Sequence, residues 1–393
     1  MHVSDFLLLA LTGLLVATVP LSLAWSATGT HRLRKLAWTL AFVTFDLIVF
    51  GAFTRLTDSG LGCPDWPGCY GEANPFLAHR HIAAAEALLP TGPVTWMKAW
   101  IEMIHRFLAM GIGFLIIALL VGCVLRWRRT RERAYAPGLP ALLLFWVLVQ
   151  GAFGAFTVTM KLQPVIVTMH LLLGMTMLAL AVWMAERLDD GMRDGMPARV
   201  PLPMAADVDA LRRLRPLAWL SAAVLLLQIA LGGWVSTNYA TLACTDFPLC
   251  QGRLVPDMDF GHGFTLWRAL GKDAAGNYLP FAALTAIHWV HRNFAAVVVL
   301  VLGWTAWRAR RVAGLRKTAR NVVLVLVAQA MTGLATVFFS FPLVVAVLHN
   351  AGAALLVLLV TMLNYQIQHL IHRTRPSPES PSRTRAAASA SHP

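Results

Sequence analysis

Residues 149–158 read VQGAFGAFTV, and residues 328–337 read AQAMTGLATV, so the second stretch repeats the small and polar positions of the first. The same displacement along the chain carries His170 onto His349. Weak internal repeats of this kind are typical of membrane proteins built from two related halves. The chain is therefore predicted to contain a duplicated unit.

The duplication extends upstream of these stretches. Residues 102–106 read EMIHR and residues 288–292 read HWVHR, so a His-Arg pair is present in both copies. Further upstream, CPDWPGC at 63–69 is matched by CTDFPLC at 244–250. Each copy keeps two histidines inside apolar sequence, which indicates two metal or cofactor sites.

The composition identifies the class of protein. The 393 residues are 58% hydrophobic and only 13% charged, as expected of a polytopic membrane protein. Spans in lipid must close their own backbone hydrogen bonds, so each apolar span of about 20 residues is predicted to be a helix. We expect nine such helices, near 6–25, 36–53, 101–125, 141–160, 165–186, 217–237, 281–307, 321–340 and 343–365.

The net charge of +14 would suit a nucleic-acid-binding protein, but its distribution argues against one. Most of the 33 Lys and Arg residues lie in alternate loops and in the tail, while the intervening loops carry the cysteine pairs. This is the positive-inside pattern of membrane topology. The basic loops are therefore predicted to be cytoplasmic, and the cysteine loops to face outward.

We predict an all-α membrane protein made of two tandem four-helix bundles, related by a pseudo-two-fold axis along the membrane normal. One extra transmembrane helix precedes them, because residues 1–5 lack the basic start of a cleaved signal peptide, which is the alternative. The expected segments are the extra helix and a cytoplasmic linker (1–35), the first repeat (36–186), a cytoplasmic linker (187–216), the second repeat (217–365) and a disordered cytoplasmic tail (366–393).

Four histidines are the candidate ligands. His105 and His170 lie in the second and fourth helices of the first repeat, and His291 and His349 in those of the second. Two imidazoles facing each other across a bundle can ligate one haem iron axially. The alternative is that they are hydrogen-bonding residues between helices. His288 is a competing ligand to His291, although only His291 is followed by the repeated arginine.

Charged residues stand beside these histidines. Arg106 and Arg292 suit the carboxylates of haem propionates, although an arginine at this depth can also simply extend its side chain to water. Glu102 shares a helix face with His105, and an acid at membrane depth is by default a functional candidate. The second copy has His288 at that place, so the two sites are predicted to differ. The alternative is a solvated Glu102 at the interface.

The outer loops carry two cysteine pairs, Cys63 with Cys69 and Cys244 with Cys250. Disulfides persist on the outer, oxidising side of a membrane, and the spacing is unlike C-x-x-C zinc or redox motifs. We expect each pair to form a disulfide that orders a lid over its site; redox-active thiols are the competing interpretation. Cys123, inside a span, is expected to be a packing residue.

At these residues the chain resembles the haem A synthase family, in the bacterial type with paired loop cysteines. The matching elements are GAFTRLTDSGL at 51–61, both cysteine pairs, and the histidine and arginine positions named above together with Glu102. The resemblance implies oxidation of the C8 methyl of haem O to a formyl group through an alcohol. It implies a haem b on His291 and His349 as electron relay, and substrate haem O between His105 and His170 with Glu102 catalytic.

The resemblance also implies a setting: a bacterial inner membrane with the cysteine loops periplasmic. Expected partners are haem O, the enzyme that makes it and an electron carrier, with no nucleic acid; a homo-oligomer is left open. Two rival functions remain at this point. A di-haem b-type cytochrome would only transfer electrons, and a transporter built on parallel repeats would show helices broken at mid-membrane depth.

Overall fold

The computed structural model describes residues 3–28, 31–193 and 205–373. Within these ranges the chain is helical and contains no β-strand, and nine of its helices are long and apolar enough to span a membrane. The prediction of an all-α membrane protein is confirmed. The spans are α1 (Val3–Trp25), α2 (His31–Leu56), α4 (Trp96–Thr130), α5 (Gly138–Thr159), α6 (Pro164–Arg193), α7 (Ala205–Thr237), α9 (Phe281–Ala309), α10 (Arg316–Phe338) and α11 (Leu343–Arg373).

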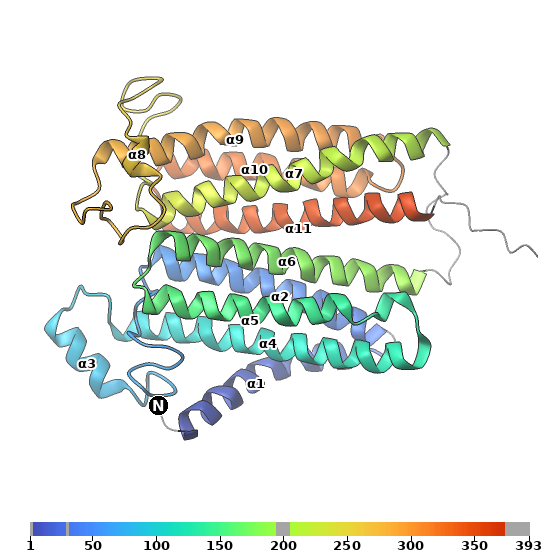
Figure 1. The fold of residues 1–393 in the computed structure, drawn as a ribbon, viewed down its shortest axis with the longest axis horizontal. Coiled ribbons are helices and arrows are strands. Elements are labelled where there is room, and N and C mark those ends of the chain that lie inside the picture. Colours follow the sequence, from blue (N-terminus) through green and yellow to red (C-terminus); the bar gives the residue numbers. More distant parts are fainter. Residues whose placement is uncertain (1–2, 29–30, 194–204, 374–393) are drawn as a thin grey trace, which may run out of the picture.

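The long helices form two neighbouring groups (Figure 1). Helices α2, α4, α5 and α6 pack together, and so do α7, α9, α10 and α11. The groups meet where α2 and α6 lie against α11, and where α6 lies against α7. The membership of each group agrees with the predicted repeats, while their relation by a pseudo-two-fold axis stays a prediction.

Helix α1 packs across α4 and α2, outside the first group (Figure 1). The helices approach closely because glycine leaves room: a Cβ atom on Gly13 would lie 2.7 Å from Cβ of Met110, and one on Gly111 would lie 2.9 Å from Cγ1 of Val16. Small residues let membrane helices approach each other in this way. The predicted extra helix is therefore present and is part of the packed structure.

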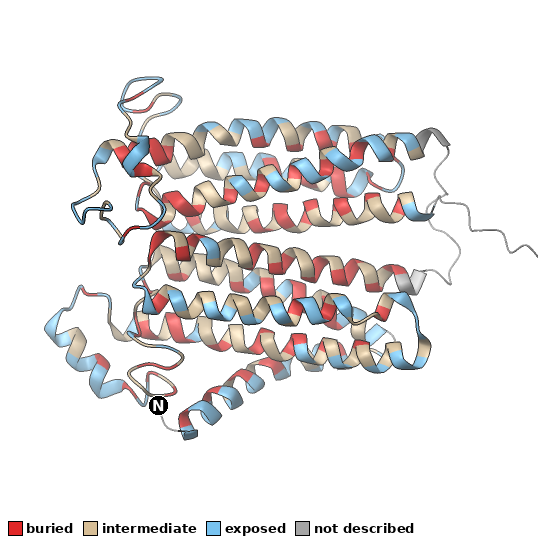
Figure 2. Ribbon diagram, viewed as in Figure 1, coloured by how far each residue is buried: buried red, intermediate tan, exposed pale blue. Residues whose placement is uncertain are grey.

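Buried residues line the contacts between helices, whereas exposed residues cover their outer faces (Figure 2). Many of the exposed residues are large and apolar, such as Leu15 on α1 and Leu300 on α9. Lipid tails are as apolar as leucine, so these outward faces need no protein partner. The buried core of the protein is therefore confined to the narrow regions where helices contact one another.

Several helices extend beyond their predicted ends. Helix α6 continues to Arg193 and α7 begins at Ala205, so the predicted linker 187–216 is largely helical where it is described. Helix α11 continues to Arg373, past the predicted start of the tail at 366. A helix satisfies its own backbone and can continue into water with polar residues, which a hydropathy window misses. Residues 374–393, predicted to be a disordered tail, lie outside the described residues.

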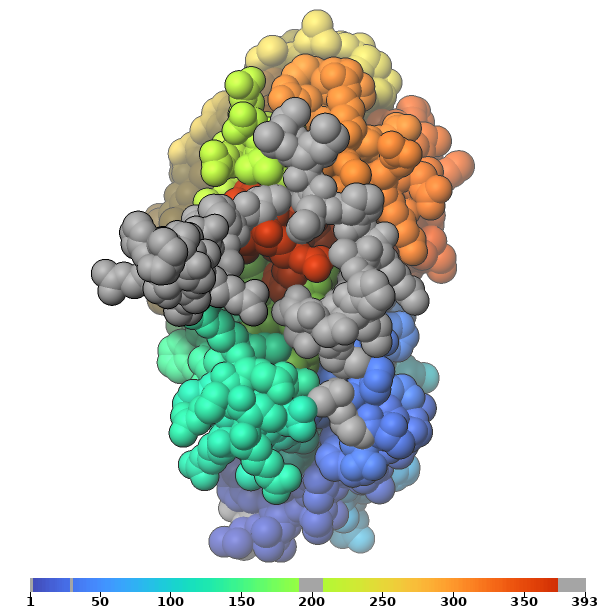
Figure 3. Space-filling view, turned by 90° about the vertical axis from the view of Figure 1, so that its right-hand side faces the viewer, coloured from blue at the N-terminus to red at the C-terminus, as the bar shows by residue number. Residues whose placement is uncertain are grey.

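The connections with the cysteine pairs gather at one end of the molecule, with the short helices α3 (His79–Leu88) and α8 (Phe260–Gly263) (Figure 1). The opposite end shows the last turns of α11 in the middle, between the two groups (Figure 3). There His369 of α11 lies 3.0 Å from the carboxylate of Asp190 on α6. The two groups are thus tied together by polar contacts at this end.

Candidate functional site

The four candidate histidines lie on four helices. His105 is on α4 and His170 on α6, and both helices pack against α2 and α5. His291 is on α9 and His349 on α11, and both of these helices pack against α7 and α10. All four residues are half-buried. Each predicted pair therefore lies within one helix group.

In the first group each imidazole lies against a glycine of the adjacent helix. A Cβ atom on Gly51 of α2 would lie 2.9 Å from Nε2 of His105. A Cβ atom on Gly154 of α5 would lie 3.3 Å from Cε1 of His170. Any larger residue would push these rings out of place.

The second group repeats this arrangement. A Cβ atom on Gly232 of α7 would lie 2.9 Å from Cε1 of His291, and one on Gly333 of α10 would lie 3.1 Å from Cε1 of His349. Gly154 and Gly333, which occupy matching positions of the repeat, both make room for an imidazole. Gly51 and Gly232 were missed, although each precedes its cysteine pair by the same number of residues.

Glutamines stand beside three of the histidines. Gln228 Nε2 lies 3.2 Å from Nδ1 of His291, and Gln150 donates to the backbone carbonyl of His170 at 3.1 Å. Gln329 Nε2 lies 3.4 Å from Nε2 of His349. Gln150 therefore holds the backbone at His170, whereas Gln228 and Gln329 contact the rings themselves.

The polar atoms around the rings are not all satisfied. Nδ1 of His170 and the Oε1 atoms of Gln150, Gln228 and Gln329 are buried without a hydrogen-bond partner. Buried polar groups are normally paired, so unpaired ones call for an explanation such as a bound group. No group of three or more His, Cys, Asp or Glu residues that could hold a metal ion occurs among the described residues. Two imidazoles in each helix group fit a haem, which needs only two axial ligands from the protein.

Glu102 and His288 have the same structural task. Glu102 is 5% exposed, and its Oε2 accepts a hydrogen bond from the backbone N–H of Cys63 at 2.8 Å. His288 is 6% exposed, and its Nδ1 accepts from the N–H of Cys244 at 3.2 Å. The alternative of a solvated Glu102 is therefore wrong. This bond ties the His288 ring to the disulfide loop, and the choice of His291 over His288 as iron ligand stays a prediction.

Each arginine binds the cysteine loop above it. Nη1 of Arg106 donates to the carbonyls of Asp65 at 2.9 Å and of Gly68, while Nη2 donates to Oε1 of Glu102 at 2.5 Å. The ion pair between Arg106 and Glu102 is largely buried. The simple alternative, a side chain that only reaches water, is wrong for Arg106, and the contact with a propionate stays a prediction.

Arg292 does the same in the second group, although His288 offers it no carboxylate. Its Nη1 donates to the carbonyl of Asp246 at 2.7 Å, and its Nη2 to that of Leu249 at 2.6 Å. Because both arginines hold a loop, the two groups share a scaffold. The charge next to each arginine differs between the two groups, because Glu102 in the first group is a carboxylate and His288 in the second is not.

Both cysteine pairs form disulfides, with S–S distances of 2.11 Å for Cys63–Cys69 and 1.98 Å for Cys244–Cys250. Each loop folds around its aspartate: Oδ1 and Oδ2 of Asp246 accept from the N–H groups of Gln251 at 2.8 Å and Gly252 at 2.9 Å. These N–H donors, that of Gly252 foremost, hold the pKa of Asp246 below its usual value.

A contact between the two groups was not predicted. Nη2 of Arg55, in the segment 51–61, donates to the carbonyl of Ser236 on α7 at 2.7 Å. Its guanidinium also lies 4.4 Å from the centre of the Tyr239 ring, and the Tyr239 hydroxyl donates to Asp58 at 2.8 Å. The ends of α2 and α7 that lead into the disulfide loops are thus joined. In the sequence, the charged residues Arg55 and Asp58 within segment 51–61 are the features that could have indicated this contact.

Comparison with known proteins agrees with this architecture. The family model described as cytochrome oxidase assembly protein, COX15-CtaA, matches residues 34–361. A Heme A synthase of Shewanella oneidensis is 37% identical over 340 residues, which cover 85% of this chain and 97% of that protein. A Heme A synthase of Rhodospirillum centenum is 32% identical over 88% of this chain and 89% of its own length.

The matched residues include both histidine pairs and both disulfide loops, and they begin after α1. The resemblance read from the motifs is therefore confirmed. This chain belongs to the COX15-CtaA family of cytochrome oxidase assembly proteins.

Proposed function

We propose that this protein is a haem A synthase, an oxidoreductase of a bacterial inner membrane that oxidises the C8 methyl of haem O to a formyl group through an alcohol. The observation that carries the proposal is the unequal pair of sites: both have two imidazoles against glycines, but only one has a buried carboxylate. The relatives named as Heme A synthase support the same activity.

In this proposal the first group binds the substrate. His105 and His170 hold the iron of haem O, and Gly51 and Gly154 leave the room that the two rings need. The disulfide loop held by Arg106 covers the outer side of this site and limits the access of water. The substrate is thereby held in one orientation while its methyl group reacts.

Glu102 is the proposed proton carrier. It lies three residues before His105, so both side chains emerge from one face of α4. Its carboxylate is held by Arg106 and by the N–H of Cys63, which fixes the positions of both oxygens. Proton transfer by a positioned carboxylate typically accelerates a reaction by about 10²–10⁴-fold. Glu102 would accept and release protons during the two oxidations.

In the second group His291 and His349 are the proposed ligands of haem b, which supplies one-electron transfer when bound. Gln228 orients His291, and Thr332 Oγ1 lies 3.1 Å from Nδ1 of His349. His288 takes over the structural task of Glu102 without its negative charge. The second site therefore lacks the proton carrier that the first site has.

The setting of the reaction completes the proposal. The disulfide loops face the periplasm, haem O arrives from the enzyme that makes it, and a separate electron carrier serves the haem b. The domain boundaries proposed from the sequence keep the substrate within 36–186 and the haem b within 217–365.

Pigment extraction tests the proposed function. The full chain is purified after co-expression with a source of haem O, and its haems are separated and identified. Haem A or its alcohol precursor together with haem b is the expected result. Haem b alone would instead favour the di-haem cytochrome that only transfers electrons.

A further inference from the structure

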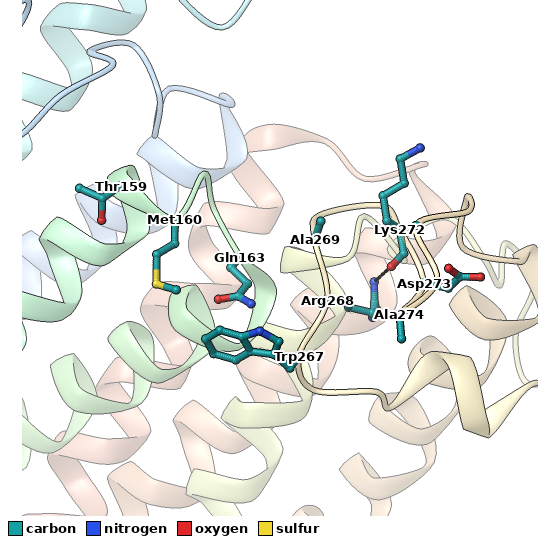
Figure 4. A pocket seen from close by; sticks show the side chains of 10 residues that line it. Thr159, Met160, Gln163, Trp267, Arg268, Ala269, Lys272, Asp273 and Ala274 are labelled. Carbon is teal, nitrogen blue, oxygen red and sulfur yellow. Dashed lines mark hydrogen bonds between the residues drawn. The ribbon is translucent and has the colours of Figure 1, made fainter.

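An open pocket of about 580 Å³ lies at the outer end of the molecule, between the two helix groups (Figure 4). One wall is the turn between α5 and α6, with Thr159, Met160 and Gln163. The other wall is the loop before α9, with Trp267, Arg268 and Lys272. None of the four histidines or their glycines lines this pocket, so it is separate from the sites described above.

Arg268 is the unusual member of the lining. It is only 3% exposed, and its guanidinium donates to neutral acceptors, the carbonyl of Lys272 at 3.1 Å and Oδ1 of Asn238 at 2.6 Å. Among the described residues it forms no salt bridge with an acid. A buried charge without a direct ion pair is costly, and burial accordingly lowers the pKa of Arg268. The lining also holds one carboxylate, Asp273, but its Oδ1 already accepts from two backbone N–H groups at 2.9 Å. Two cations against one carboxylate leave the lining with a net positive charge, which suits an anion.

Gln163 provides a second, independent indication. Its side chain is 8% exposed, and its Oε1 is buried without any hydrogen-bond partner. The amide lies between Met160 and Trp267 on the pocket wall (Figure 4). A buried acceptor left unpaired costs about 1–3 kcal/mol. A ligand with a hydroxyl donor would satisfy it.

The depth of the pocket in the membrane indicates which ligands can reach it. Helix α5 ends at Thr159 and α9 begins at Phe281, so the pocket lies at the level where the helices leave the membrane. Leu266 and Trp267 are 61% and 64% exposed beside it. Exposed tryptophan at helix ends is typical of the headgroup layer of a bilayer. The pocket therefore faces lipid headgroups.

We propose that this pocket binds an anionic phospholipid of the outer leaflet through a phosphate that carries a hydroxylated headgroup, as in phosphatidylglycerol. Arg268 attracts the phosphate from the pocket wall, and Lys272 does so from the rim, where its ammonium lies 3.8 Å from the centre of the Tyr278 ring. The headgroup hydroxyl donates to Oε1 of Gln163. Met160 and Trp267 pack against the apolar part of the lipid. Because the walls come from both helix groups, the bound lipid joins them at the outer end. The proposal does not depend on the proposed enzymatic function.

Lipid titration of the purified full chain in detergent tests the proposal. Phosphatidylglycerol is expected to raise Tm and to remain bound in native mass spectrometry, whereas phosphatidylcholine does neither. Gln163→Leu should weaken binding about fivefold, as expected for the loss of one hydrogen bond. Lys272→Met should weaken it at low salt and less so at high salt, because salt screens charges.

Arg268→Gln should abolish the effect of phosphatidylglycerol, but its loop contacts also stabilise the fold, so the two milder variants decide the outcome. Arg253→Gln is the matched control: this arginine lies in the same connection between α7 and α9 but does not line the pocket, and its side chain is 66% exposed. It should bind phosphatidylglycerol as the wild type does. Equal stabilisation by phosphatidylcholine, or unchanged binding in both Gln163→Leu and Lys272→Met, would overturn the proposal. An equal effect of inorganic phosphate alone would assign the pocket to a free anion and refute the lipid.

Discussion

Gly51 on α2 and His105 on α4 meet so closely that a Cβ atom on the glycine would lie 2.9 Å from Nε2 of the imidazole. The three other candidate histidines each face a glycine in the same way. Glycine at these positions costs helix stability, since it is about 1 kcal/mol less favourable than alanine. Glycine is nevertheless present at all four positions, which indicates that the position of each ring matters more than the stability of the helix that faces it.

Replacing Gly232 tests this relationship at the proposed haem b site. In Gly232→Ala the new methyl group would lie 2.9 Å from Cε1 of His291, so the ring must move. Overpacking of this kind costs about 1–3 kcal/mol, and we expect a reduced haem b content with a changed absorption spectrum. Gly303→Ala on α9 is the control, because a Cβ there meets nothing within 4 Å. A wild-type spectrum in Gly232→Ala would show that Gly232 does not set the position of the His291 ring.

Glu102→Gln separates the structural role of this side chain from its proton transfer. The amide oxygen can still accept from the N–H of Cys63 or from Arg106, but the side chain no longer takes up or releases a proton and no longer forms an ion pair with Arg106. We expect haem b to remain bound and the reaction to stop at haem O or the alcohol, with a rate lower by about 10²-fold or more. Glu102→Ala should do the same and also loosen the loop. Wild-type rates of haem A formation in either variant would contradict the catalytic role.

Single substitutions distinguish the two neighbouring histidines of α9. His291→Ala should abolish the bis-imidazole spectrum of haem b, because His349 alone leaves the iron with one ligand. His288→Ala should retain that spectrum while losing the bond to the N–H of Cys244. If the signal persisted in His291→Ala and vanished in His288→Ala, the ligand assignment would be reversed.

Removal of the second disulfide tests whether the cysteines act by structure or by redox chemistry. Serine at both Cys244 and Cys250 should destabilise the loop by about 2–3 kcal/mol, which limited proteolysis of the outer face can measure. Activity at low temperature should remain, since Arg292 still holds the loop carbonyls. Complete loss of activity with an intact, protease-resistant fold would favour the redox-active thiols.

The loop around Asp246 should respond to acid. The pKa of this carboxyl lies below its ordinary value of 3.8, because the ionised form accepts the N–H groups of Gly252 and Gln251. A lowered folded pKa means that the stabilisation is present above about pH 3.8 and is lost as the pH falls through the folded pKa. Hydrogen exchange at Gln251 and Gly252, corrected for intrinsic rates, should accelerate in that range. Asp246→Asn should exchange quickly at neutral pH as well, and slow exchange there would contradict the assignment.

The sequence alone determined the membrane class and the nine spans found in the described residues, and it predicted the pairing of His105 with His170 and of His291 with His349. Apolar length dictates a helix in lipid, and a duplication places equivalent residues at equivalent positions. The C-x-Asp-aromatic-Pro-x-Cys spacing likewise predicted both disulfides. Each of these features depends on nearby residues in the sequence or on the internal duplication. They can therefore be predicted without knowing which residues are neighbours in space.

The tertiary structure decided which atoms meet. It alone placed Gly51 and Gly232 against imidazoles, gave Glu102 and His288 the same N–H to accept, and joined Arg55 to Ser236. A membrane helix is apolar on every side, so its sequence carries little information about which face packs against which neighbour. The orientation of each helix is set by close packing among all its neighbours, and only the assembled fold contains that information.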